Sequence, residues 1–467
     1  MNNEMKLDEH IKRQEMQVQP DDKGVSDGQL PDAQAVADGS VFERIPVYGK
    51  NNCMEARQKA AERMPDLWRC LKTKDDLLHM LNVALGGLYG EWPLKITMGQ
   101  LNKYAYTSLG AKRYTSFKIP KKRKGEFRTI DAPVPVLKYI QRGLNFALQC
   151  HYTPHVSAMG FVQHRSVVDN AKVHTGQRLV YNIDLKDFFP SITAGRLHKR
   201  LMAKPFSLSK EMASIITDLC CYTNAEGRHV LPQGAPTSPT ITNIICERMD
   251  SKLSRLAKAY GLKYTRYADD ITFSGMNNVF YEDSRFLKSM RNIIENEEHF
   301  AINSDKTRLC HQGMRQEVTG LSVNQQENVS RKYVKQLRTM LHNWEMNGYD
   351  KAQTVFAKHY AETKRSNLMV QGTHHIENVI DGKLMFLKMV KGDNDCTYKS
   401  LDARFRALMD NLSAAGIDDS EQKNHSPRVV AGTPLVPKGE KEVFLETIYN
   451  LEKILNNENN NNDGRQE

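Results

Sequence analysis

The sequence predicts an α+β fold in which helices surround a small antiparallel sheet. Residues 263–273 hold two runs of β-branched and aromatic residues with two adjacent aspartates between them. This pattern is typical of a β-hairpin with the acids at or beside its turn. Residues 180–190 predict another strand, which a proline ends. Apolar residues at helical spacing dominate elsewhere, for example over 136–150 and 333–341.

The aspartates of these strands form the candidate catalytic centre. Asp184 is predicted at the carboxyl end of the first strand, and Asp269 and Asp270 at the hairpin turn. Adjacent carboxylates repel each other unless a cation neutralises them, and Mg²⁺ prefers carboxylate oxygens and substrate phosphates. Two ions that clamp an attacking and a leaving oxygen need carboxylates from at least two segments. We therefore predict that Asp184, Asp269 and Asp270 are catalytic and bind two Mg²⁺ ions, the alternative being surface acids on a solvated loop.

The order of the short motifs resembles the palm of reverse transcriptases. The motifs that carry this resemblance are Asp184, Gln233-Gly234, Ser238-Pro239 and Tyr267-Ala268-Asp269-Asp270. Residues 119–128 resemble the basic fingers hairpin of that family, and residues 302–307 its Asn-x-x-Lys-Thr segment. The resemblance covers about 105–324, and more loosely extends to about 408. It implies a right-hand polymerase fold, with fingers, an antiparallel-sheet palm and a helical thumb, and RNA-directed DNA polymerase activity.

The same resemblance implies a set of residues that bind the incoming dNTP. Lys121 and Arg128 would hold its triphosphate, unless they form a solvated basic turn. Phe189 would act as the aromatic gate that excludes a 2′-hydroxyl, the alternative being an ordinary core phenylalanine. Gln233 would pack beside the base and sugar. Lys306 would steady or protonate the leaving pyrophosphate, or be a simple surface lysine.

Two segments resemble signatures of bacterial retron reverse transcriptases. Asn170-Ala171-Lys172-Val173-His174 matches an Asn-Ala-x-x-His signature, and Val318-Thr319-Gly320 matches a Val-Thr-Gly signature. By resemblance, Asn170, His174, Val318, Thr319 and Gly320 would recognise the RNA or position the primer end. Nothing in their chemistry demands this, and His174 is equally consistent with a buried, hydrogen-bonded residue.

The retron resemblance implies a specific reaction and set of partners. The enzyme would copy part of its cognate structured noncoding RNA, which serves as template and primer, into a branched, RNA-linked single-stranded DNA (msDNA). Its product would be an RNA–DNA hybrid made from dNTPs, within an antiphage defence system that has a separately encoded effector. Because no RNase H domain is found in the sequence, a host RNase H would remove template RNA.

Two other readings of the sequence stay open. The first is another bacterial reverse transcriptase, of the group II intron, diversity-generating or abortive-infection type, although no Cys-x-x-Cys endonuclease pattern follows the thumb. The second is a noncatalytic RNA-binding scaffold with a polymerase fold. The carboxylate cluster argues against a scaffold, because a protein that only binds RNA does not need clustered carboxylates without a neutralising partner.

The chain divides by composition into five predicted parts. They are an acidic, disordered extension (1–50), N-terminal helices and fingers (51–178), the palm (179–324), a helical thumb (325–412) and a C-terminal extension with an Asn-rich tail (413–467). The first of these holds ten acidic and six basic residues, whereas the whole chain carries a formal charge of +11. The remainder is therefore strongly basic, which suits a nucleic-acid partner.

Cysteine usage and hydropathy indicate the compartment. None of the eight cysteines forms a Cys-x-x-Cys pair, which favours a reducing cytoplasm over a disulfide framework or a zinc site. The N-terminus lacks the apolar core of a secretory signal, and no apolar run is long enough to span a bilayer. We expect a cytoplasmic protein with no membrane partner.

Overall fold

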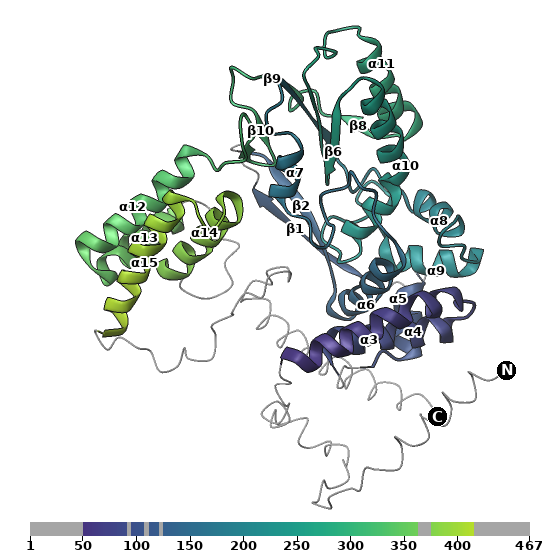
Figure 1. The fold of residues 1–467 in the computed structure, drawn as a ribbon. Helices are drawn as coiled ribbons and strands as arrows, with labels where there is room; N and C mark the ends of the chain where they lie inside the picture. The colour runs from purple at the N-terminus through teal and green to yellow at the C-terminus, as the bar shows by residue number, and fades with distance from the viewer. Residues whose placement is uncertain (1–49, 91–94, 107–111, 121–124, 363–374, 415–467) are drawn as a thin grey trace, which may run out of the picture. The chain divides into compact units, whose positions relative to one another are not determined.

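The computed structural model describes residues 50–90, 95–106, 112–120, 125–362 and 375–414. The predicted N-terminal extension, the Asn-rich tail and Lys121 lie outside the described residues. The α+β class is confirmed, because helical units accompany a five-stranded sheet (Figure 1). Among the described helices, none is long and apolar enough to cross a membrane.

Four helices build the N-terminal part and the base of the fingers. They are α3 (Lys50–Arg69), α4 (Lys74–Tyr89), α5 (Met98–Ala105) and α6 (Pro135–His151). Thr73 caps α4 through a capping box with Asp76, which satisfies backbone donors at the helix start. The stripe predicted for 136–150 lies on the buried face of α6, where Leu137, Ile140 and Leu144 are inaccessible to solvent. The spacing of these leucines and isoleucines therefore determines which face of α6 packs inward.

The fingers hairpin consists of β1 (Tyr114–Pro120) and β2 (Phe127–Pro133). The strands pair antiparallel with Phe117 opposite Ile130 and Ile119 opposite Arg128. Because side chains alternate along a strand, Arg128 and Ile130 lie on the same face of this ribbon.

The palm sheet has β3 (Leu179–Lys186) at its centre. Strand β7 (Asp270–Gly275) pairs with one side of β3 and with β6 (Lys263–Tyr267), while β8 (Ala301–Ile302) and β9 (Arg308–His311) pair with the other side. All these pairings are antiparallel, as the sequence predicted.

Helices pack on both faces of β6. The side chains of Tyr264 and Arg266 bond Asp250 on α10 (Ser238–Ala259), whereas Thr265 between them bonds residues on and just after α7 (Val167–Val173). Because alternate side chains point to opposite faces of a strand, α10 and α7 cover opposite faces. Figure 1 shows α10 and α11 (Arg285–Arg291) running beside the sheet, with the π-helix η3 (Asn292–Glu297) continuing α11.

Smaller elements complete the palm. They are α8 (Ala194–Met202), α9 (Lys210–Cys220), β4 (Tyr222–Thr223), β5 (His229–Val230), β10 (Glu317–Val318) and β11 (Leu321–Ser322). Cys220 and Cys221 at the end of α9 are free thiols and fully buried. They pack as small hydrophobes, as expected for cysteines that follow an apolar helix.

The C-terminal helices form a bundle with its own core. They are α12 (Arg331–Asn347), α13 (Tyr349–Glu362), α14 (Ile376–Lys391) and α15 (Cys396–Ala414), which lie together in Figure 1. Leu337, Leu341 and Leu384 belong to a hydrophobic cluster that also contains Val168 of α7 and Val318 of the palm. This shared cluster therefore packs the C-terminal helices against α7 and the palm.

Candidate active site

The sheet brings the three predicted aspartates together. Asp184 on β3 pairs directly with Asp270 at the start of β7, and the N–H of Leu185 donates to the carbonyl of Asp269 at 3.0 Å. Loss of hydration raises the pKa of Asp269, and the Asp184 charge raises it further. Asp270 keeps an exposed surface, but partial loss of hydration around its carboxylate, then repulsion by Asp269 and Asp184, raises its pKa to about 6. The three carboxylates thus share one site whose negative charge is poorly compensated.

Asp184 has two fixed partners in the segment that follows β8. Asn303 donates from Nδ2 to Asp184 Oδ1 at 2.9 Å, and Lys306 Nζ lies 2.9 and 3.0 Å from the two carboxylate oxygens. The backbone N–H of Asn303 also donates to the Asp184 carbonyl at 2.8 Å. Lys306 is half-exposed, but it belongs to the site and is not an isolated surface lysine.

The donor set fits a hard divalent cation, although the carboxylates are not arranged as a finished metal cage. Among the described residues, no group of three or more His, Cys, Asp and Glu side chains is placed to hold a metal ion. The Asp184 carboxylate faces Lys306 and Asn303. The raised pKa values of Asp269 and Asp270 indicate charge that a cation would neutralise. These three aspartates are the residues that would hold Mg²⁺.

A buried arginine that sequence reasoning missed holds the catalytic turn. Arg266 is fully buried, and two of its nitrogens bond the two oxygens of Asp250 at 2.8 and 2.7 Å. Its Nη1 donates to the carbonyl of Ala268 at 3.1 Å, and Nη2 donates to Asn243 at 3.1 Å. Ala268 has a left-handed backbone with φ +57°, which is unusual for alanine. Arg266 therefore fixes the strained residue that precedes Asp269.

The loop between α6 and α7 packs against the same turn through Met159 and Gly160. The N–H of Met159 donates to the Arg266 carbonyl at 2.7 Å, and Asn243 donates to the Gly160 carbonyl at 3.0 Å. A Cβ at Gly160 would lie 2.6 Å from the Ala268 nitrogen, so only glycine allows this approach.

The fingers strand β2 rests on the loop that contains Gln233. The Asp131 N–H donates to the Gln233 carbonyl at 2.9 Å. Gly234 has φ +141°, and a Cβ there would come within 2.9 Å of the Ile130 side chain. Ile130 and Arg128 share this face of β2, so Arg128 points to the same side as the Gln233 loop. Its positive charge acts to lower the pKa of Asp269, which places Arg128 in electrostatic reach of the carboxylates.

Phe189 is partly buried beside the site, whereas Phe188 belongs to the core. Phe188 is only 4% exposed and packs edge-on against Phe189 with ring centres 5.6 Å apart. Phe189 is thus a partly buried ring that packs against the core, and its role as a gate stays a prediction.

The two signature residues of the Asn-Ala-x-x-His segment, Asn170 and His174, lie inside the protein. His174 is fully buried, with Nε2 2.7 Å from Thr265 Oγ1 and Nδ1 2.7 Å from Ser274 Oγ. Thr265 uses its single proton to donate to Asn170 Oδ1 at 2.6 Å, so it accepts from His174 Nε2–H, and Nδ1 accepts from Ser274. This network assigns a neutral histidine, in keeping with burial that lowers the pKa of His174 to about 3.

The Val-Thr-Gly segment ends the same hydrogen-bond chain. Asn170 Nδ2 donates to Thr319 Oγ1 at 3.5 Å, and Thr319 donates to the Val167 carbonyl at 3.3 Å. Thr319 and Gly320 form the two-residue turn between β10 and β11, and both have positive φ. Such a turn needs a residue like glycine, and Val318 is buried beside it. The two signature segments are therefore parts of one network, within which Asn170 and His174 face protein groups.

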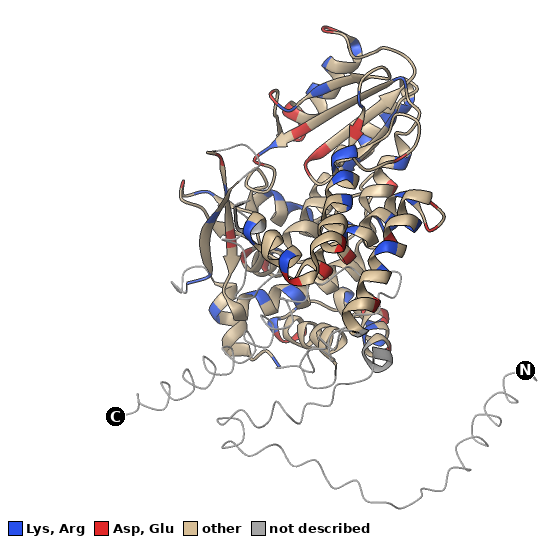
Figure 2. Cartoon of the chain, turned by 90° about the vertical axis from the view of Figure 1, so that its left-hand side faces the viewer, with Lys and Arg blue, Asp and Glu red and all other residues tan. Residues whose placement is uncertain are grey.

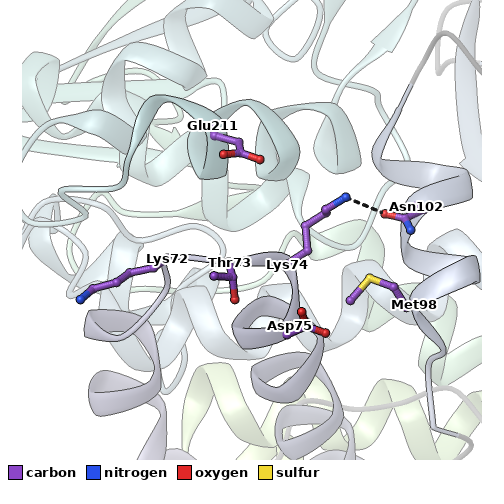
Figure 3. A pocket seen from close by; sticks show the side chains of 7 residues that line it. All are labelled: Lys72, Thr73, Lys74, Asp75, Met98, Asn102 and Glu211. Atoms are coloured by element: carbon purple, nitrogen blue, oxygen red, sulfur yellow. Dashed lines mark hydrogen bonds between the residues drawn. The ribbon is translucent and has the colours of Figure 1, made fainter.

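A surface pocket of about 380 Å³ lies away from these residues (Figure 3). Its lining residues come from α5, α9 and the start of α4, and they are Lys72, Thr73, Lys74, Asp75, Met98, Asn102 and Glu211. It contains none of the predicted site residues, and Thr73 and Asp76 already cap the helix end beside it.

Lys and Arg side chains are spread over the described helices and strands with acids between them (Figure 2).

Comparison with known proteins shows the family to which the chain belongs. The family described as "Reverse transcriptase (RNA-dependent DNA polymerase)" matches residues 119–355. The Retron Mx162 reverse transcriptase of Myxococcus xanthus is 39% identical over 50% of this chain and 53% of its own length. The Retron Ec86 reverse transcriptase of Escherichia coli is 34% identical over 50% of this chain and 70% of its own length. The chain thus spans only about half the length of the first of these relatives.

One group of solved structures is similar at a much lower level. A telomerase from Candida albicans with a fragment of telomeric RNA covers 68% of this chain and 68% of its own chain, with 14% identity and a TM-score of 0.36. This likeness is too low to support an inference about the present site.

Proposed function

Because the chain belongs to the reverse transcriptase family, among its retron-type members, we propose that it is an RNA-directed DNA polymerase that reverse-transcribes part of a cognate structured noncoding RNA into a branched, RNA-linked single-stranded DNA. The observation that carries the proposal is the meeting of Asp184, Asp269 and Asp270 at one end of the sheet. A site of that composition suits nucleotidyl transfer.

The residues around the carboxylates have complementary roles in this proposal. Two Mg²⁺ ions bound by the aspartates would supply charge neutralisation for the 3′-oxygen and for the leaving pyrophosphate. Arg128, on the face of β2 that meets the Gln233 loop, grips the triphosphate, and Lys121 assists it. Gln233 lies beside the base and sugar. Lys306, whose Nζ is already within the site, donates a proton to the pyrophosphate as it leaves.

The retron signature residues act indirectly in this proposal. Asn170 and His174 hold the β6–β7 hairpin, and Val318, Thr319 and Gly320 hold the turn at the root of the C-terminal helices. They position the primer end by fixing these elements, since Asn170, His174 and Val318 are buried. The remaining proposals are an antiphage role with a separately encoded effector, template removal by a host RNase H, and a cytoplasmic location.

Expression with the native upstream locus tests the proposal. Small nucleic acids are extracted and treated with RNase and with a debranching enzyme. The wild type should yield an RNase-resistant DNA that debranching shortens, and Asp269→Ala with Asp270→Ala should yield none. Asp393→Ala is the matched control, because its side chain is 70% exposed in a surface ion pair, and it should behave as wild type.

Two other results would replace the proposal. DNA that lacks a branch would assign the protein to another group of reverse transcriptases. No DNA from soluble wild-type protein with intact RNA would favour the noncatalytic scaffold.

A further inference from the structure

Phe161 is a bulky residue with a strained backbone beside the gate residue Phe189. Its φ is +61° and its side chain is 40% exposed. The two rings lie 6.3 Å apart, tilted by 50°. A left-handed backbone at phenylalanine costs about 1–3 kcal/mol and persists only where the surroundings enforce it. The position of this ring therefore needs an explanation.

The loop that carries Phe161 is anchored on both sides. Arg165 Nη1 donates to the carbonyls of Val156 and Ala158 at 2.7 and 2.6 Å. The neighbouring Gly160 accepts from Asn243 and lies against the catalytic turn. These contacts fix the backbone at Phe161, so its ring stays next to Phe189 and does not turn into the core.

Phe189 consequently has two aromatic neighbours, one from the core and one from the loop. Phe188 supports one side, and it is itself packed against Phe300 with ring centres 5.6 Å apart. Phe161 contacts Phe189 from the loop. Without Phe161, the Phe189 ring would have room to move, because only the Phe188 side belongs to the close-packed core.

We infer that Phe161 is a positioning residue that sets the sugar specificity of the polymerase. It holds the Phe189 ring where a ribose 2′-hydroxyl would clash, and so favours dNTPs over rNTPs. This inference rests on the proposed function and on the gate role of Phe189 within it. It is distinct from a role in binding the template or primer, because that would change the use of dNTPs and rNTPs alike.

Single-nucleotide incorporation on an RNA template with a DNA primer tests the inference. The quantity measured is the ratio of kcat/KM for dCTP to kcat/KM for CTP. Phe161→Ala should lower this ratio about tenfold, as expected for losing apolar packing at a specificity pocket, and Phe161→Tyr should restore it. Phe189→Ala should lower the ratio at least as much. Tyr281→Ala removes another exposed aromatic, 60% exposed, and should leave the ratio unchanged.

The double variant Phe161→Ala with Phe189→Ala shows whether Phe161 acts through the gate. Its ratio should equal that of Phe189→Ala alone, because two residues acting through one contact are not additive. A wild-type ratio in folded Phe161→Ala, beside a lowered ratio in Phe189→Ala, would overturn the inference and leave the polymerase proposal intact. If Phe161→Ala does not fold, the ratio of kcat/KM for dCTP to kcat/KM for CTP is measured for Phe161→Leu instead, and the same two outcomes apply. No dCTP incorporation by the wild type, on this template or on its cognate RNA, would reject both proposals.

Discussion

Lys306 Nζ lies 2.9 Å from one carboxylate oxygen of Asp184 and 3.0 Å from the other. The two residues are 122 positions apart, and the segment after β8 brings them together. The Lys306 side chain is 51% exposed and that of Asp184 12%, so water screens the pair from the lysine side and we expect it to contribute about 1 kcal/mol to folding. The lysine is therefore better explained by chemistry at the carboxylates than by stability.

Replacing Lys306 with methionine should separate these two roles. Lys306→Met is expected to lower the single-turnover rate of dNTP incorporation about 100-fold, within the range of a lost proton donor, with an unchanged Tm. Lys288→Met removes a comparable surface pair with Asp283 and should keep the wild-type rate. An unchanged rate in Lys306→Met would show that the lysine only occupies the site.

Asp270 should make the metal-free protein less stable at high pH. Its folded pKa of about 6 lies above the ordinary value of 3.8, so the folded state binds the proton more tightly than the unfolded state. Stability from this group therefore rises as pH falls from about 7 towards 4. With EDTA present, the Tm of Asp270→Asn should be higher than that of the wild type at pH 8, and this difference in Tm should be smaller at pH 5. A difference that is constant with pH would contradict the raised pKa.

The sequence was sufficient to predict the elements that local patterns determine. Alternating β-branched residues on both sides of Asp269 and Asp270 predict β6 and β7, and the structure pairs these strands as expected. The roles of Arg128 and Gln233 in binding the dNTP stay predictions that rest on the order of the motifs.

Other parts of the site depend on contacts that no local pattern reveals. Arg266 looked like one more basic residue in a strand, since its partner Asp250 lies on a separate helix. The one available signal was an acid on the mostly buried face of α10. The backbone of Phe161 is left-handed only because distant residues hold its loop. His174 could not be assigned from sequence to the interior, because histidine occurs both buried and exposed.

The buried pair of Arg266 and Asp250 should be costly to break from one side. Arg266→Met leaves Asp250 without its cation and is expected to lower the free energy of unfolding by about 3–5 kcal/mol. It also removes the donor to the Ala268 carbonyl, so incorporation should fall even where the protein remains folded. Denaturant unfolding and single-turnover rates measure the two effects. The control Arg255→Met changes an exposed residue of α10, the helix that carries Asp250. It should change neither the free energy of unfolding nor the incorporation rate.

The double variant Arg266→Met with Asp250→Leu tests the origin of that cost. Removing both charges leaves no buried ion, so part of the stability should return, although the buried Tyr264 hydroxyl loses its acceptor. Activity should not return with it, because the Ala268 carbonyl still lacks its donor. Recovery of full activity would show that the turn does not need Arg266.

His174 should make the fold sensitive to acid. The pKa of His174 is about 3 in the folded state, against an ordinary value of 6.5. Between these two values the unfolded state binds a proton that the folded state does not. The stability that His174 contributes is present above pH 6.5 and is lost progressively as pH falls towards 3. Between pH 7 and pH 5 this loss is about 2 kcal/mol.

Urea unfolding of the wild type and His174→Gln at pH 7, 6 and 5 measures this contribution. Glutamine does not titrate, so the stability advantage of the wild type should shrink by about 2 kcal/mol between pH 7 and pH 5. The comparison cancels the other titrating groups, which both proteins share. An advantage that stays constant over this range would mean that His174 can bind a proton while the fold is intact. That result would reject the assigned direction of its hydrogen bonds with Thr265 and Ser274.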